Sequence, residues 1–154
     1  RKINFKQRRY SDLNRYLLLN TMKNLQMFSN QFASSATENL YNLSLLEEMD
    51  DAEYLAEVLT LFLKEASTEL KGMKDALHQR KADILCSKAH KMKSSTGVIQ
   101  ANELTEYLDR IEKIAKAGTI NDELRSLVEK AGQLYNLLEQ ALKKHMKELS
   151  QGPR

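Results

Sequence analysis

The chain has 154 residues, with 42% hydrophobic and 29% charged residues, which is typical of one globular domain. Its 5 Gly and 1 Pro are too few for the many turns of a β-sandwich or barrel, so long helices are favoured. No apolar run approaches the roughly 20 residues that span a bilayer. The single cysteine, Cys86, excludes an internal disulfide and suits a reducing compartment.

The net charge of +3 is unevenly distributed, because residues 1–37 contain seven Lys or Arg and one acid, Asp12. This segment therefore carries +6 and the remainder −3. Apolar residues in the stretch 12–32 partly follow a helical spacing, and residues 29–39 are rich in Ser, Asn, Ala and Thr. We expect a basic N-terminal helical extension or linker over residues 1–37. Contact with nucleic acid or an anionic lipid surface is the alternative, which no aromatic-basic interleaving supports.

Helical patterning becomes strong after residue 38. A short apolar stripe precedes Asp51, and from Leu55 to Leu77 apolar residues recur at i, i+3, i+4 and i+7. Helix starts are expected at Asp50-Asp51 and Asn121-Asp122, a turn over 79–83 and a helix stop at Gly118. Asn102 is expected to be a further cap or a local irregularity. Four helices with short connections predict an all-α protein, an antiparallel up-down four-helix bundle over residues 38–150. Residues 151–154 are expected to be a disordered tail.

The segment 89–97 contains the residues that could carry chemistry. On a helix, His90, Lys93, Ser94 and Gly97 share one face, which is turned away from the apolar stripe. A neutral imidazole is a nucleophile, and Lys93 could neutralise a phosphoryl group transferred to it. The small residues Ser94 and Gly97 leave room for a partner, although Gly costs a helix about 1 kcal/mol relative to Ala. The alternative is a surface histidine on a charged helix face.

Metal binding is a weaker interpretation. Cys86 and His90 are four residues apart, a spacing that two ligands of one metal ion can use. A structural zinc site needs four ligands, and neither His78 nor His145 has a comparable pairing. We therefore expect no metal site, and we expect His78 and His145 to be solvated.

The run His90-Lys91-Met92-Lys93-Ser94-Ser95-Thr96-Gly97, with Ala89 before it and Ala101 after it, resembles the signature of histidine-containing phosphotransfer (HPt) domains. That signature commonly reads A-H-x-L-K-G-[SA]-[SA]-x-x-x-G-A. Met92 replaces Leu here, and Ser94 and Gln100 replace Gly. The resemblance extends from about Leu40 to Leu149 and includes the elements Leu61-Phe62-Leu63 and Leu108-Asp109-Arg110-Ile111-Glu112.

The resemblance implies a phosphorelay carrier rather than an enzyme. It implies that His90 accepts a phosphoryl group from the aspartyl phosphate of a receiver domain and passes it to a second receiver. It further implies that Lys93 helps to hold this group and that Glu112 orients the imidazole. A carboxylate that accepts the proximal N–H leaves the distal nitrogen free. The alternative for Glu112 is an ion pair with Lys113 or Lys116.

Receiver domains of response regulators are the expected partners, docking at Lys91, Ser94 and Gly97. No nucleotide-binding Gly loop is present in the sequence, so we expect no cofactor here and Mg²⁺ only on the receiver. Because the chain begins at Arg1 without an initiator Met, we interpret it as an excised fragment of a larger protein or as a processed chain. The N-terminal extension favours a hybrid two-component sensor histidine kinase as its source, and a free-standing relay protein is the alternative. We expect the domain to be cytoplasmic and monomeric, with a membrane involved only through that parent. The alternative function is a helical docking or coupling module without phosphotransfer.

Overall fold

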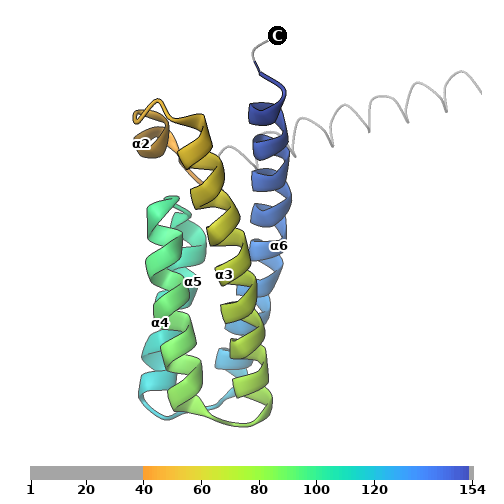
Figure 1. Cartoon of the computed structure of the whole chain (residues 1–154). Helices are drawn as coiled ribbons and strands as arrows, with labels where there is room; N and C mark the ends of the chain where they lie inside the picture. The colour runs from red at the N-terminus through yellow and green to blue at the C-terminus, as the bar shows by residue number, and fades with distance from the viewer. Residues whose placement is uncertain (1–39, 153–154) are drawn as a thin grey trace, which may run out of the picture. The chain divides into compact units, whose positions relative to one another are not determined.

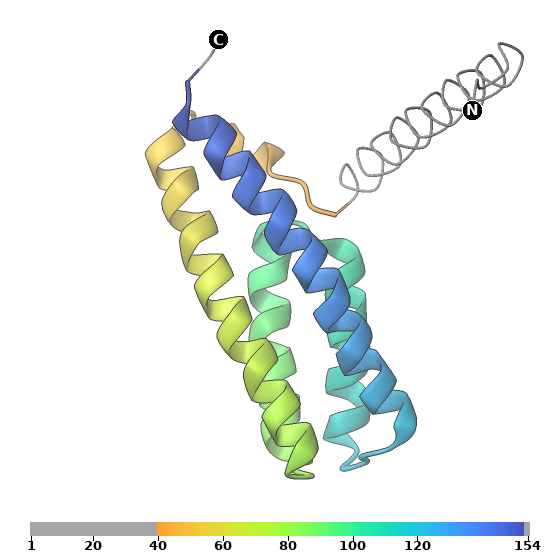
Figure 2. The ribbon, with the colours of Figure 1, turned by 90° about the vertical axis from the view of Figure 1, so that its right-hand side faces the viewer.

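The computed structural model describes residues 40–152. This part of the chain consists of helices joined by turns and short irregular segments, without strands. The helices are α2 (Ser44–Glu47), α3 (Ala52–His78), α4 (Ala82–Val98), α5 (Asn102–Lys116) and α6 (Asp122–Ser150). Helices α3 to α6 lie side by side and alternate in direction (Figures 1 and 2). This arrangement confirms the predicted all-α four-helix bundle. The predicted extension over residues 1–37 lies outside the described residues, so that segment and its boundary stay predictions, as does the tail.

Two of the predicted helix starts are capped by side chains. Asp51 accepts a hydrogen bond from the Tyr54 amide (2.9 Å), and Asn121 accepts one from the Leu124 amide (2.8 Å). Gly118, with a φ of 75°, ends the turn after α5 in the left-handed region, as predicted for a helix stop. The prediction that Asn102 caps α5 is wrong, because Ala101 is the N-cap and Asn102 is already helical.

The end of α4 shows the structural consequence of one departure from the HPt signature, Gln100. Gln100 has a φ of 49°, and the amides of Gln100 and Ala101 donate to the carbonyl oxygens of Gly97 (3.2 Å) and Thr96 (3.0 Å). This geometry is that of a helix C-terminus closed by one left-handed residue, where Gly is preferred. Gln100 therefore occupies a glycine position at a cost of roughly 1 kcal/mol.

The core is a single cluster to which every long helix contributes. In α4, Leu85, Ala89 and Met92 are fully buried, and they belong to the same cluster as the fully buried Leu108 and Ile111 of α5. Because these residues fix which side of α4 faces inward, the opposite side must face solvent.

The prediction of a helical apolar stripe before α3 is only partly confirmed. Helix α2 has just four residues, Leu43 is buried before it, and Met49 after it is 58% exposed. The chain turns at Asp50, whose φ of 52° interrupts helical continuity before α3 begins. Among the described helices, none combines the length and apolar character that crossing a bilayer requires.

Candidate functional site

His90 lies in the middle of α4 on its solvent-facing side, with 65% of its side chain exposed. Its Nδ1 is 2.8 Å from Oε1 of Glu112, which projects from α5. An ionised carboxylate can only accept, so this contact places the proton of a neutral imidazole on Nδ1. The lone pair then resides on Nε2, the nitrogen that Glu112 leaves free.

Glu112 is held in its ionised form by a lysine. Lys93, one turn after His90, places Nζ 2.6 Å from Oε2 of Glu112. This hydrogen bond lowers the pKa of Glu112, outweighing partial burial, and the contact with His90 lowers it further. Each Glu112 oxygen thus has one partner from α4, which fixes the carboxylate between the imidazole and the ammonium.

A second carboxylate extends the network along α5. Asp109 Oδ1 lies 3.1 Å from Lys93 Nζ, and its Oδ2 lies 2.6 Å from Lys113 Nζ. The hydrogen bonds that Asp109 accepts from Lys113 and Lys93 lower its pKa. The hydrogen bonds that Lys93 donates to Glu112 and Asp109 raise the pKa of Lys93. We call His90, Lys93, Asp109, Glu112 and Lys113 the α4–α5 cluster. Lys113, an alternative partner of Glu112 in the sequence analysis, pairs with Asp109 instead.

On the other side of α4, Glu69 of α3 binds two lysines. Its Oε1 is 2.8 Å from Lys91 Nζ, its Oε2 is 3.0 Å from Lys88 Nζ, and its side chain is only 3% exposed. Burial raises the pKa of Glu69, but the hydrogen bonds from Lys91 and Lys88 outweigh it and the net pKa is lowered. These three residues form the α3–α4 cluster, which ties α4 to α3 beside His90.

The surface beside His90 is open. Ser94 is exposed, and its hydroxyl donates to the carbonyl oxygen of His90 (3.2 Å). Gly97 is exposed as well, and a Cβ added there would meet no heavy atom within 4 Å beyond its immediate neighbours and its own helix backbone. Val98, the next residue, is 53% exposed. The structure therefore places Ser94 and Gly97 on the accessible side of α4, together with His90.

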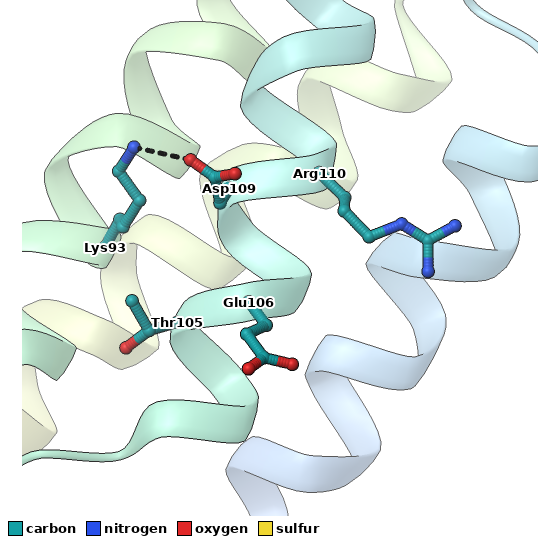
Figure 3. A pocket seen from close by; sticks show the side chains of 5 residues that line it. All are labelled: Lys93, Thr105, Glu106, Asp109 and Arg110. Carbon is teal, nitrogen blue, oxygen red and sulfur yellow. Dashed lines mark hydrogen bonds and ion pairs between the residues drawn. The ribbon is translucent and has the colours of Figure 1, made fainter.

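A shallow pocket opens beside the α4–α5 cluster (Figure 3). It is lined by Lys93, Thr105, Glu106, Asp109 and Arg110. Lys93 and Asp109 point toward each other and are in direct contact, whereas Arg110 points away toward α6 and pairs with Glu123 (3.0 Å). The pocket thus mixes both signs of charge at the edge of the histidine site.

The sequence analysis missed Asp109 and Glu69. Asp109 precedes Glu112 by three residues and Lys113 by four, so all three belong to one face of α5. Glu69 occupies a position of the apolar stripe of α3, between Ala66 and Met73. A buried acid needs a charged or hydrogen-bonding partner, so an acid at a predicted core position could have indicated a buried ion pair.

The remaining histidines lie elsewhere. His78 is exposed at the end of α3, as expected. His145 is only 26% exposed and meets Tyr41 edge-on, with ring centroids 6.1 Å apart, so the expectation of a solvated side chain is wrong. Within residues 40–152, no group of three or more His, Cys, Asp or Glu side chains is placed to hold a metal ion.

Comparisons with known proteins give a consistent result. A family model described as Hpt domain matches residues 57–152. A crystal structure of histidine-containing phosphotransfer protein B from Pseudomonas aeruginosa is similar with a TM-score of 0.64 and 23% identity, over 69% of this chain and 90% of that chain. A putative histidine-containing phosphotransfer protein from rice has a TM-score of 0.65 and 18% identity, over 82% and 94% of the two chains. A search of curated proteins found no match.

Proposed function

Because this chain belongs to the Hpt domain family, whose members carry phosphoryl groups in two-component signalling, we propose that His90 is its phosphoryl acceptor and relays the group between two receiver aspartates. The observation that supports this most strongly is the 2.8 Å contact between His90 Nδ1 and Glu112 on an otherwise exposed ring. It combines a free nucleophilic nitrogen with a fixed imidazole. A solvent-exposed histidine without a function would not need a hydrogen-bond partner on another helix.

The proposed reaction is a displacement at phosphorus. Nε2 of His90 attacks the phosphorus of an aspartyl phosphate, the N–P bond forms, and the acyl P–O bond breaks to release the receiver's carboxylate. The imidazole becomes positively charged, and its Nδ1 proton stays hydrogen-bonded to the Glu112 carboxylate, which stabilises that charge. Transfer to the second receiver is the reverse reaction on another aspartate. The receivers supply Mg²⁺ to both steps.

We propose that the receiver docks on the open surface around His90, at Lys91, Ser94 and Gly97. Helices α3 and α4 are antiparallel, and the contacts of Glu69 with Lys88 and Lys91 set their register, which puts Leu61 of α3 level with the end of α4. Leu61 and Val98 are 56% and 53% exposed, so they offer apolar area beside the charged site. An interface below about 1,200 Å² suits an encounter that must end after transfer.

The test of the acceptor uses the full chain and a phosphorylated receiver. Wild-type protein should acquire an acid-labile, base-stable phosphoryl group, and His90→Gln should acquire none. His78→Gln is the matched control, because His78 is also exposed and lies at the far end of α3. Labelling of the His90→Gln variant would overturn the assignment. An unlabelled wild-type protein that still binds the receiver would favour the docking module.

The docking surface is tested separately by adding bulk at Gly97. Gly97→Leu should keep the fold, since the position is open, and should lose transfer from the receiver while a small phosphodonor still labels His90. Ser126→Leu, at an exposed position of α6, is the control and should transfer normally. Normal transfer by Gly97→Leu would place the receiver elsewhere.

A further inference from the structure

We propose that Asp109 is a positioning residue that competes with the phosphoryl group for Lys93, and so sets how strongly His90 retains that group. The inference rests on the proposed function, because it concerns the phosphorylated form of His90. Asp109 was not among the site residues expected from the sequence, and its side chain contacts Lys93 and Lys113 rather than the imidazole. Its effect must therefore pass through Lys93.

The first argument is the number of carboxylates that share Lys93. Its Nζ contacts Glu112 Oε2 at 2.6 Å and Asp109 Oδ1 at 3.1 Å. One ammonium thus faces two carboxylates, and the three groups together carry a net charge of −1. A phosphoryl dianion on Nε2 would meet a lysine whose charge is already overcompensated.

The second argument separates the two carboxylates. Glu112 also accepts from His90 Nδ1, so losing it would release the imidazole as well. Asp109 is bound only to lysines, and its contact with Lys93 is the longer one. When a phosphoryl oxygen binds the Lys93 ammonium, the contact of Lys93 with Asp109 is therefore the one that weakens. Figure 3 shows Lys93 reaching across from α4 to Asp109 on α5.

The third argument concerns Lys113, which binds the other oxygen of Asp109 at 2.6 Å. Lys113 neutralises part of the Asp109 charge and thereby weakens its pull on Lys93. Removal of Asp109 and removal of Lys113 should therefore have opposite effects. If Asp109 and Lys113 served only to stabilise the fold, the two removals would not have opposite effects on how strongly His90 retains the phosphoryl group.

The quantity to measure is the equilibrium between the receiver's aspartyl phosphate and phosphorylated His90, in the full chain. Asp109→Asn should raise the ratio of phosphorylated His90 to phosphorylated receiver by about two- to fivefold, the range of a partly exposed ion pair. Lys113→Met should lower it by a similar or smaller factor. Both shifts should shrink at high salt, which screens exposed charges. Glu106→Gln is the control, since Glu106 lines the same pocket without being a partner of Lys93.

Labelling with a small phosphodonor such as phosphoramidate separates this inference from the proposed function. If wild-type His90 is never labelled by the donor or the receiver, the proposed function fails. If His90 is labelled and Asp109→Asn leaves the equilibrium ratio unchanged or lowers it, the competition by Asp109 is overturned while the acceptor stands. Shifts of equal sign for Asp109→Asn and Lys113→Met would also overturn it.

Discussion

Two ion clusters flank α4, and they differ in how much water reaches them. In the α3–α4 cluster the carboxylate of Glu69 is 3% exposed, whereas in the α4–α5 cluster Glu112 and Asp109 are 19% and 36% exposed. Burying one unpaired charge costs several kcal/mol, whereas an exposed pair contributes about 0–1 kcal/mol. We therefore expect the same residue types to hold α4 in place on one side of His90 and, as proposed above, to adjust the chemistry of the imidazole on the other.

The largest expected effect on stability comes from removing both lysine partners of the buried Glu69 carboxylate. The double variant Lys88→Met and Lys91→Met leaves Glu69 buried without a cation, and we expect it to lower the free energy of unfolding by about 3 kcal/mol. The matched control is Lys64→Met with Lys71→Met, which changes two exposed lysines of α3. Urea denaturation measures both. A loss below about 0.5 kcal/mol for the Lys88 and Lys91 pair would mean that the α3–α4 cluster is not structural.

The second prediction uses pH to isolate Glu69. Its folded pKa lies below the value of 4.5 expected for an unperturbed glutamate, so its ionised form stabilises the fold. This contribution is complete above pH 4.5 and is lost as the pH falls through the folded pKa. The free energy of unfolding should therefore fall more steeply with acid in wild-type protein than in Glu69→Gln. Parallel pH profiles for the two proteins would contradict this.

The third prediction concerns the end of α4, which lies outside both clusters. Replacing Gln100 by Gly removes a left-handed non-glycine residue, with its φ of 49°. We expect Gln100→Gly to raise the free energy of unfolding by about 1 kcal/mol, seen as a higher midpoint of thermal or urea unfolding. The exposed helical position Ser126→Gly should instead destabilise, by about 0.5 kcal/mol. An unchanged or lower midpoint for Gln100→Gly would show that the left-handed turn carries no strain.

The smallest effect on stability is expected in the α4–α5 cluster. Lys93→Ala should change the free energy of unfolding by less than about 1 kcal/mol, because Asp109 is partly exposed and keeps Lys113, and Glu112 keeps its contact with His90. The same variant should slow phosphoryl transfer, since Lys93 orients Glu112 and lies beside the imidazole. Lys116→Ala, an exposed lysine at the end of α5, is the control for both measurements. A large stability loss with normal transfer would reverse the roles of the two clusters.

The fold was predictable because apolar spacing and helix caps act locally. The stripe of α3 and the caps Asp51 and Asn121 required no knowledge of partners. The contact of Glu112 with His90 could be expected only through the family resemblance, since 22 residues separate them. Between helices, which lysine pairs with which acid depends on the rotation of one helix against another, and a single-sequence pattern does not determine it. The pair of Lys113 with Asp109 is an i,i+4 contact within α5, a local pattern that the sequence does offer. The contacts of Glu69 with Lys88 and Lys91, on another helix, became visible only with the helices packed.

The most direct test of the phosphoryl acceptor and its oriented imidazole is ³¹P–¹⁵N correlation by NMR on the receiver-phosphorylated, ¹⁵N-labelled chain. This measurement identifies both the histidine and the nitrogen that carry the group. The contact of Nδ1 with Glu112 predicts a single N–P bond, at Nε2 of His90. A phosphoryl group at Nδ1 of His90, or on His78 or His145, would contradict the proposed role of the α4–α5 cluster.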